Sequence, residues 1–348
     1  MTSTDADAPP LDRLARVVAH LGAVVAAERL TGGMFATTYR VTLGDGRRVV
    51  VKTAPVDDDR LLTYEHDLVR TEGLVYALAA DRPDLLMPRL LATDHSRTAF
   101  PGDVVVAAHL DGVPWADAGL GAPADDPRAA RAERDLGALM ARLHTVTGEA
   151  FGYVGAVHAR GGAQDPPGTR LHGATWPEAF GRMLDALLAD AGRWGVDVPA
   201  REVRDAAARH HDALAAVVRP ALVHGDLWPG NLFVDPADGA LVGVVDAERA
   251  LWADPLVELV GADQVGRGPV PAGLLSGYAA QAGAPLDVTS DAARARLLLY
   301  RLHMSLVLCV EAVPRRYDAA GDPASFGYLT LAARTVRWAL DELAALPA

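Results

Sequence analysis

The sequence is poor in lysine and cysteine, each of which occurs only once among its 348 residues. The single cysteine, Cys309, cannot form an intrachain disulfide, and its place in the apolar stretch "SLVLCVEAV" indicates a buried structural thiol. This usage fits a reducing compartment. The first twelve residues, "MTSTDADAPPLD", are acidic and hold no apolar segment typical of a signal peptide. We therefore expect a cytoplasmic protein.

Positive charge is also scarce, because 33 basic residues face 45 acidic ones and the net charge is −12. Nucleic acids and anionic membranes bind to basic patches, so neither is expected as a partner. The most apolar stretch, "LLLYRLHMSLVLCVEAV", is interrupted by Arg301, His303 and Glu311, which argues against a membrane span. The sequence leaves open whether the protein is a monomer or a homodimer.

Half of the residues are hydrophobic, so the chain can bury a sizeable core, and its length suits two domains or one bilobal unit. Residues 1–110 predict a small β-rich lobe with an N-terminal helix over 11–27. Its other predicted elements are three strands within 28–55, including a hairpin at Gly44–Gly46, a helix over 63–83, and strands over 87–94 and 103–110. Residues 111–348 predict a helical lobe, with helices over 128–146, 175–195, 201–218, 291–313 and 326–346.

The stretch "LVHGDLWPGNLFVD" carries most of the chemical information in the sequence. It places three polar side chains, His224, Asp226 and Asn231, between apolar strand residues. Their spacing matches the catalytic loop of phosphoryl-transfer enzymes, with Gly225 in place of the usual arginine. Asp246 follows at the end of the next apolar strand, where a carboxylate and an asparagine can hold Mg²⁺ together. The sequence thus predicts a phosphoryl-transfer site.

A hydrolytic metal site is an alternative interpretation of the same stretch. His224 and Asp226 would then be two ligands, with His210 or His211 as a third. Those two histidines are adjacent in a predicted helix, where neighbouring residues face different directions, so the interpretation is the weaker one. A turn without function would explain "WPGN" but would leave both aspartates unexplained.

Lys52 is the exception among basic residues, because the other 32 (33 − 1) are all arginine. In phosphoryl-transfer enzymes a lysine on the third strand of the small lobe contacts the α- and β-phosphates and a glutamate of the next helix. A planar guanidinium would change that geometry. Glu72 is the predicted partner on the inward face of its helix, whereas Glu65 is expected to be a solvated cap near the helix start. Gly32 and Gly33, in "TGGMF", predict the turn that covers the phosphates.

These motifs make the chain resemble the aminoglycoside phosphotransferase family of small-molecule kinases, which is related to fructosamine kinases and choline kinases. The likeness extends from about residue 28 to about residue 260 and is expected to continue through the following helices to the end of the chain. The Leu-Trp pair in "HGDLW" is particularly similar to fructosamine kinases. The likeness implies an α+β, bilobal, protein-kinase-like fold with a five-stranded antiparallel β lobe plus a helix and a larger, mainly helical lobe. One departure from the family pattern is "ADPLVELV", which has Ala253 and Glu258 where glycine and aspartate are common.

The resemblance also implies roles for individual residues. Asp226 would be the catalytic base, supported by His224, and the backbone near Ala108 and Leu110 would receive the adenine of ATP or GTP. The remaining implied roles are Mg²⁺ ligation by Asn231 and Asp246, and phosphate positioning by Lys52 and Glu72.

The expected reaction is transfer of the γ-phosphoryl group to a hydroxyl of a small molecule. A composition rich in alanine and arginine is typical of high-GC actinobacteria, so we expect a sugar-containing antibiotic, aminoglycoside-like or nucleoside, as the acceptor and resistance as the purpose. A metabolic kinase of a sugar, ketosamine or amino alcohol is the alternative, followed by a catalytically inactive nucleotide-binding module. A protein kinase is disfavoured because no Ala-Pro-Glu element follows Asp246. Residues 157–173 and the helix end at 308–318 are expected to line the acceptor pocket.

Overall fold

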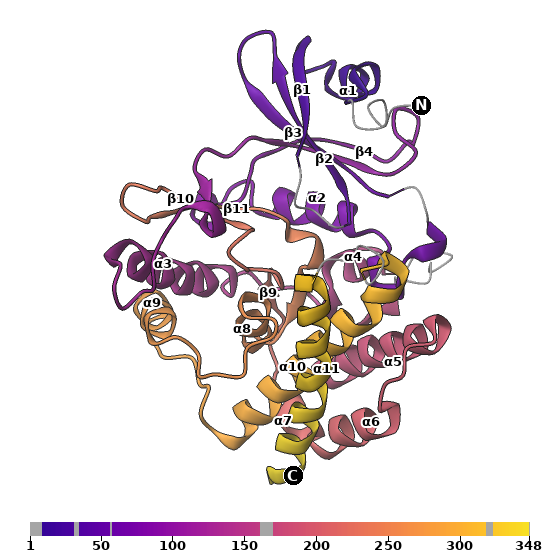
Figure 1. The fold of residues 1–348 in the computed structure, drawn as a ribbon, viewed down its shortest axis with the longest axis vertical. Coiled ribbons are helices and arrows are strands. Elements are labelled where there is room, and N and C mark those ends of the chain that lie inside the picture. The colour runs from indigo at the N-terminus through magenta and orange to yellow at the C-terminus, as the bar shows by residue number, and fades with distance from the viewer. Residues whose placement is uncertain (1–8, 31–34, 56–57, 161–169, 318–322, 348) are drawn as a thin grey trace.

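The computed structural model describes residues 9–30, 35–55, 58–160, 170–317 and 323–347. One end of the molecule is a five-stranded antiparallel sheet of strand order β1-β2-β3-β5-β4 (Figure 1). Its strands are β1 Val24–Leu30, β2 Thr37–Leu43, β3 Arg48–Thr53, β4 Leu90–Asp94 and β5 Val104–Ala108. The sheet and its antiparallel pairing are as the sequence predicted.

The sheet is covered on both faces, which explains why its inner strand β5 is apolar throughout. On β5, Val104 and Val106 pack into the cluster that contains helix α1 (Leu11–Val18), whereas Val105 and Ala107 pack on the side of α2 (Leu68–Leu78). This is the alternation that a strand imposes on successive side chains. Helix α2 lies between the sheet and the helices below it, so its residues face both parts of the molecule (Figure 1).

The hairpin between β2 and β3 is confirmed, because Gly46 has a φ of +85° and its N–H donates to Leu43 O at 2.9 Å. The helix predicted over 11–27 is wrong in length. Helix α1 ends at Val18, and β1 begins at Val24 after Gly22, whose φ is +147°. Residues 24–27 pair with β2 instead, so tertiary pairing overrides their local helical pattern.

The other end of the molecule is mainly helical and holds two small sheets. Its helices are α3 Pro127–Leu143, α4 Val154–His158, α5 Trp176–Trp194, α6 Ala200–Arg209, α7 His211–Ala215, α8 Leu256–Ala262, α9 Ala272–Ala282, α10 Asp291–Arg315 and α11 Pro323–Ala345. One small sheet has the order β11-β10-β6, and the other β8-β7-β12-β9. Their strands are β6 Val113–Pro114, β7 Phe151–Tyr153, β8 His172–Gly173, β9 Ala221–Val223, β10 Leu232–Val234, β11 Leu241–Val244 and β12 Leu251–Ala253.

The chain leaves the large sheet after β5 and next pairs through β6, which joins β10 of the helical part. The division of the chain into units at residues 1–110 and 111–348 stays a prediction. Two segments that were each predicted as one continuous helix are divided in the structure. The helix over 63–83 is a short 3₁₀ turn followed by α2, and the helix over 201–218 breaks into α6 and α7 at His210.

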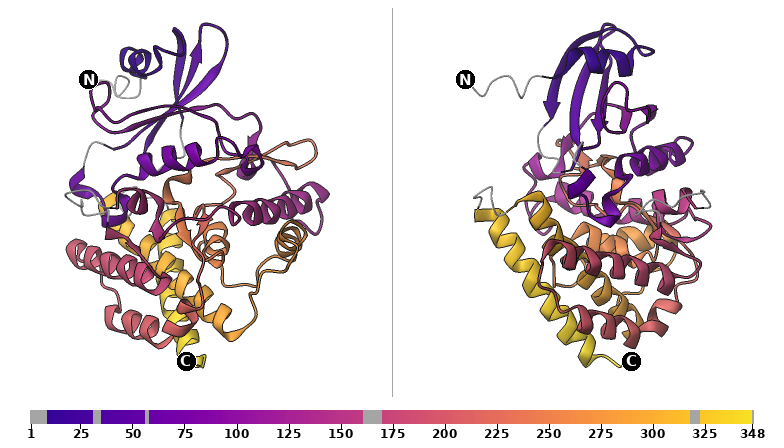
Figure 2. Two further views of the ribbon diagram at one scale, coloured as in Figure 1. Left: turned by 180° about the vertical axis from the view of Figure 1, so that it is seen from behind. Right: turned by 90° about the vertical axis from the view of Figure 1, so that its right-hand side faces the viewer.

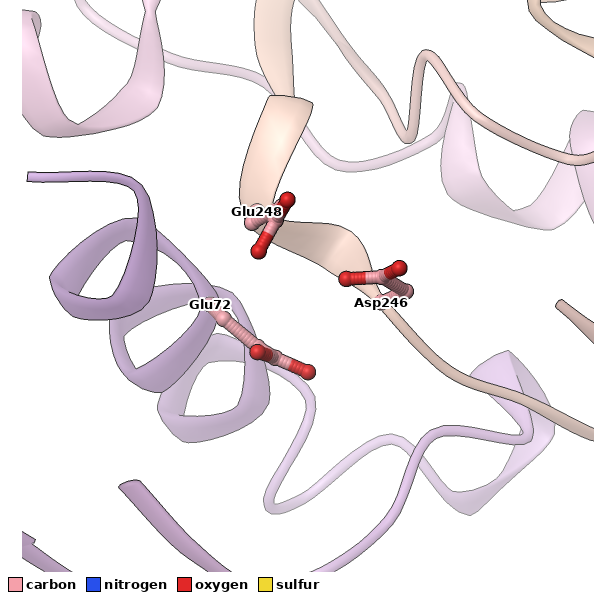
Figure 3. A group of neighbouring side chains, drawn as sticks. All are labelled: Glu72, Asp246 and Glu248. Carbon is pink, nitrogen blue, oxygen red and sulfur yellow. The ribbon is translucent and has the colours of Figure 1, made fainter. Parts of the chain in front are cut away.

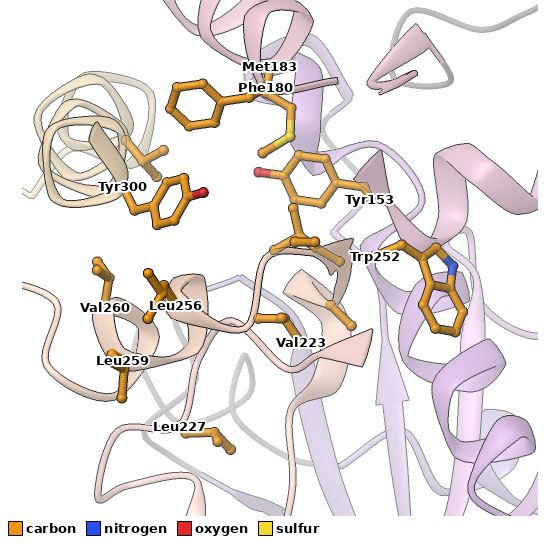
Figure 4. Close-up of a cluster of buried hydrophobic side chains, with 14 of the residues drawn as sticks. Tyr153, Phe180, Met183, Val223, Leu227, Trp252, Leu256, Leu259, Val260 and Tyr300 are labelled. Atoms are coloured by element: carbon orange, nitrogen blue, oxygen red, sulfur yellow. The ribbon is translucent and has the colours of Figure 1, made fainter. Parts of the chain in front are cut away.

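Helix α10 is long and apolar enough, by length and composition, to cross a membrane. However, 72% of its most apolar window is buried inside the molecule, which is the pattern of a core helix. Helix α11 packs beside it along the outer side of the helical part, as the two further views show (Figure 2). Buried aromatic and aliphatic side chains of α5, α8 and α10 pack together in one cluster (Figure 4).

Candidate active site

The segment between β9 and β10 contains the predicted catalytic loop, and its path depends on Gly225. This residue has a φ of +78°, and a Cβ atom there would lie 2.9 Å from the backbone oxygen of Arg249. Both constraints exclude a side chain. The close approach of two backbones therefore explains why the usual arginine of this motif is absent.

Glu258 of α8 holds the start of the loop from behind. Its carboxylate accepts hydrogen bonds from the N–H groups of His224 at 2.8 Å and Gly225 at 2.9 Å. Burial raises the pKa of Glu258 to about 7, although the two backbone donors act in the opposite direction. In the sequence, Glu258 stands out only as a departure from the family pattern. The structure shows that it binds the backbone of the catalytic loop.

His224 links the loop to the end of β11. Its Nε2–H donates to Val245 O at 3.1 Å, and its Nδ1 accepts from the N–H of Asp226 at 3.3 Å. Those partners assign the proton to Nε2, because a carbonyl only accepts and a backbone N–H only donates. Burial lowers the pKa of His224 to about 4, so the ring is neutral at neutral pH. His224, the predicted supporting residue, thus connects the end of β9 to the end of β11.

Asp226, the predicted base, is held by two side-chain amides. Oδ2 accepts from Asn231 Nδ2 at 3.1 Å, and Oδ1 accepts from Gln264 Nε2 at 2.6 Å. Burial, together with the nearby Asp246 and Glu311 carboxylates, raises the pKa of Asp226 to about 7 against the opposing effect of Arg249. A carboxyl group with a pKa in this range is suited to take a proton near neutral pH.

Lys52 lies among the carboxylates of Glu72, Asp246 and Glu248. Figure 3 shows that these three side chains come from α2 and from the segment after β11. The Nζ of Lys52 is 2.8 Å from Glu72 Oε2, 2.8 Å from Glu248 Oε2, and forms a third ion pair with Asp246. Its side chain is only 12% exposed. Burial alone would lower the pKa of Lys52, but the three carboxylates raise it well above its usual value. The predicted pairing of Lys52 with Glu72 is present, and Glu248 joins it.

The donor set at this point fits a divalent cation. Glu72, Asp246 and Glu248 have carboxylate oxygens within 4.8 Å of one another, and such hard oxygen donors are the ligands that Mg²⁺ prefers. Asp246 is the most accessible of the three, with 29% of its side chain exposed. Asn231 uses its amide nitrogen for Asp226, which leaves its amide oxygen as a ligand of the kind that Mg²⁺ takes.

Tyr76 and Glu248 are site residues that sequence reasoning missed. The hydroxyl of Tyr76 donates to Glu72 Oε1 at 2.6 Å and accepts from the N–H of Asp246 at 3.2 Å, so it joins α2 to the segment after β11. Tyr76 is one helical turn from Glu72, which is a signal the sequence contains. Burial and Asp246 raise the pKa of Glu248 to about 8, although Lys52 lowers it.

A second charged cluster lies at the end of α10. Glu311 is 2.9 Å from Arg249 and 3.7 Å from Arg315, and Arg315 also pairs with Glu65. The expectation that Glu65 is solvated is wrong. It does cap its turn, accepting from Leu62 N at 2.8 Å, but it is fully buried because α10 supplies a partner that the local sequence does not show. Tyr64 donates to Glu311 in the same cluster.

A cavity of about 40 Å³ opens beside Gly225 and Arg249. It is lined by aromatic and aliphatic side chains, among them Tyr153, Phe180 and Tyr300, which are also drawn in Figure 4. Val307 of α10 belongs to its wall. The predicted acceptor loop at 157–173 lies largely outside the described residues, and the assignment of the acceptor pocket stays a prediction.

The predicted adenine contacts lie where β5 leaves the sheet. The N–H groups of Ala108 and His109 are bonded to Arg89 O at 2.9 Å and Arg48 O at 3.3 Å. Leu110 is therefore the next residue along the segment that can donate to an adenine. Gly32 and Gly33, the predicted phosphate-covering turn, lie outside the described residues.

The alternative hydrolytic metal site is not assembled among the described residues. His210 is buried and its Nε2 bonds to Leu343 O at 2.9 Å, and His211 is exposed and lies 3.4 Å from its neighbour Asp212. The group of side chains that could hold a metal contains neither of them, nor His224.

Comparisons with known proteins agree with this geometry. The sequence model of the phosphotransferase enzyme family (APH) matches residues 26–298, which is more than half of the chain. The structure of a candidate fructosamine-3-kinase from Thermobifida fusca is similar with a TM-score of 0.64 and 23% identity, covering 96% of this chain and 99% of that one. A candidate aminoglycoside phosphotransferase from Ralstonia eutropha is similar with a TM-score of 0.62 and 13% identity, covering 97% and 99%. The predicted kinase-like fold is confirmed.

Proposed function

The chain belongs to the phosphotransferase enzyme family, and on that premise we propose that it transfers the γ-phosphoryl group of ATP to a hydroxyl group of a small molecule. One observation carries the proposal. Lys52 of β3, Glu72 of α2 and Asp246 after β11 are far apart in sequence but converge within ion-pair distance beside the loop that contains Asp226. Complexes of a relative with AMP-PNP and with ADP support ATP as the donor, with GTP as the alternative.

In this proposal each of these residues has a separate role. Lys52 holds the α- and β-phosphates, and Glu72 orients its ammonium group. Asp226 accepts the proton of the acceptor hydroxyl as the new P–O bond forms, and ADP leaves with the electrons of the old one. Asn231 and Asp246 would bind Mg²⁺, which offsets the charge of the phosphates when bound.

For the acceptor we favour a sugar-containing antibiotic, aminoglycoside-like or nucleoside, with resistance as the purpose of the reaction in the cytoplasm. Solved relatives hold hygromycin B, streptomycin and gentamicin, which supports small hydroxylated ligands of this size. The fold itself does not choose among acceptors, because acceptor pockets come from variable helices and loops.

A metabolic kinase of a sugar, ketosamine or amino alcohol is the second candidate, and the cluster at the end of α10 favours it. Glu65 and Glu311 each pair with an arginine, so neither offers an uncompensated negative charge to a polycationic acceptor. The mainly apolar cavity beside Gly225 would suit an uncharged or weakly charged group.

The test is ATP consumption by the purified protein across a panel of aminoglycosides, nucleoside antibiotics, macrolides, sugars and ketosamines, with mass spectrometry of the products. We expect one class to gain a phosphate. The Asp226→Asn variant is expected to lose transfer by about a thousandfold while nucleotide still binds, because the phosphate contacts remain. Near-normal turnover of that variant would remove the assignment of Asp226 as the base.

A further inference from the structure

The carboxylate of Asp226 is held on both oxygens, and the two donors differ in origin. Asn231 belongs to the same loop and also donates to the backbone oxygen of Asp226 at 2.9 Å. Gln264 comes from beyond α8, and its amide donates to the other oxygen at the shorter distance of 2.6 Å. One donor leaves a carboxylate free to rotate about its Cβ–Cγ bond. Two donors on different oxygens fix that rotation.

Helix α8 brings Gln264 to this position through a series of contacts with the loop. Glu258 binds the backbone of His224 and Gly225. One turn later, Gly261 lies so close that a Cβ atom would be 2.7 Å from the carbonyl carbon of Gly225. The helix ends at Ala262, and Gln264 then reaches the side chain of Asp226. Contacts from α8 and from the residues directly after it thus follow the loop from its backbone to the carboxylate of Asp226.

The turn that carries Gln264 is fixed without its side chain. Asp263 N donates to Val260 O at 3.2 Å, and Gly266 N donates to Asp263 O at 3.3 Å. Arg301 of α10 donates to the same Asp263 oxygen at 2.9 Å. A change of the Gln264 side chain should therefore leave the backbone in place, which separates its effect on Asp226 from an effect on folding.

We propose that Gln264 is a positioning residue that sets the orientation of the Asp226 carboxylate toward the acceptor hydroxyl. The proposal rests on the proposed function, in which Asp226 takes the proton of that hydroxyl. In such a reaction a displacement of about 1 Å at the reacting group costs about a hundredfold in rate. In this proposal the amide of Gln264 acts through Asp226, so we expect it to affect the transfer step and to leave nucleotide binding by Lys52 unchanged.

The test compares Gln264→Met and Gln264→Glu with the wild type. Methionine has a similar length but donates no hydrogen bond, so we expect kcat to fall about tenfold to a hundredfold. The KM for ATP, the Kd of a nucleotide analogue measured by calorimetry, and the melting temperature should stay unchanged. Glutamate has the same shape but places a second carboxylate against Asp226, so its kcat should fall further. Wild-type kcat in either variant would overturn the proposal, as would a rise in the nucleotide Kd that accounts for the whole loss.

Gln281→Met is the matched control, because Gln281 is exposed on α9, and it should behave as the wild type. Crystal structures of the wild type and of Gln264→Met test the proposal independently of any acceptor. A rotated Asp226 carboxylate in the variant supports it, and an unchanged carboxylate overturns it. If the wild type phosphorylates no acceptor in the panel, the proposed function fails while the crystallographic comparison still decides the orienting contact.

Discussion

The side chain of Lys52 is only 12% exposed and is held by three carboxylates from two segments, so the size of its head group matters more than its charge. A guanidinium is larger and planar, and it would displace Glu72 or Asp246 to enter the same space. We expect Lys52→Arg to lower kcat/KM by about a hundredfold, because misplaced phosphates are poorly aligned for transfer. Steady-state kinetics measures this loss, and the melting temperature without nucleotide should change little.

Arg48→Lys is the control for this prediction, because it makes the opposite exchange at an exposed position of the same strand, β3. Arg48 is exposed and pairs with Asp111 at 2.6 Å, a surface contact that contributes little to stability. This variant should keep wild-type kinetics. If Lys52→Arg also kept them, the lone lysine would have no special role in the site.

The pKa of Asp226 leads to a prediction for the pH dependence of activity. Burial raises this pKa to about 7, so the carboxylate becomes increasingly protonated as the pH falls below 7 and can no longer accept a proton. We expect kcat/KM, which reports the free enzyme, to decrease with falling pH through an apparent pKa near 7. A profile measured from pH 9 to pH 5 that remains flat below pH 7 would contradict this.

At the residue scale, the sequence could predict contacts between residues that belong to one motif or to elements whose order along the chain is typical of phosphoryl-transfer enzymes. The pairing of Lys52 with Glu72 follows from strand and helix order, and the loop of His224 and Asp226 follows from its spacing. Glu248 and Gln264 could not be predicted in the same way. Their contacts with Lys52 and Asp226 depend on the path of the backbone in three dimensions, and no motif includes them.

At the scale of elements, α8 is the support of the catalytic loop, and its glycine makes that support testable. We expect Gly261→Ala to destabilise the protein by about 1–3 kcal/mol, since the new methyl group would overlap the backbone of Gly225 and force a shift. Because the loop carries Asp226, kcat should fall as well. Thermal unfolding and steady-state kinetics of the variant check both effects.

Gly181→Ala in α5 is the matched control, because a Cβ atom there meets open space. Alanine favours a helix over glycine, so this variant should be more stable by about 0.5–1 kcal/mol with unchanged kinetics. Equal behaviour of the two variants would mean that α8 does not hold the loop by close approach.

The elements themselves were predictable where local pattern and tertiary structure agree. Helices α3, α5 and α10 begin after the capping side chains of Asp126, Thr175 and Ser290 and have apolar faces, and both signals are visible in the sequence. Residues 24–27 were not predictable, because their pairing partner in β2 lies beyond a turn and outweighs a helical pattern. The break at His210 depends likewise on a partner in α11, the carbonyl of Leu343.

At the scale of the whole molecule, the two parts are joined by buried charge as well as by apolar packing. Glu65 precedes α2, whereas its partner Arg315 ends α10. Such pairs are 250 residues apart in sequence, so no local pattern can indicate them. The sequence therefore predicts the two parts and the site between them, but the contacts that hold the parts together need the structure.

The interior also buries neutral imidazoles, which gives a prediction for global stability. Burial lowers the pKa of His144 to about 3 and those of His224 and His303 to about 4. An unfolded chain binds these protons with a pKa of about 6.5, so between pH 6.5 and pH 4 the unfolded state holds more protons than the folded state. The free energy of unfolding should therefore decrease as the pH falls through this window.

His303 isolates the effect, because its pKa is lowered by burial alone and its ring contacts Phe180 in the core. A shift from about 6.5 to about 4 corresponds to about 3 kcal/mol of stability lost at low pH. We expect His303→Phe to lose about that much less than the wild type between pH 7 and pH 4, whereas His211→Gln, on the surface, should follow the wild type. Urea unfolding at both pH values measures the difference. Parallel losses in His303→Phe and the wild type would show that this ring takes up its proton without opening the fold.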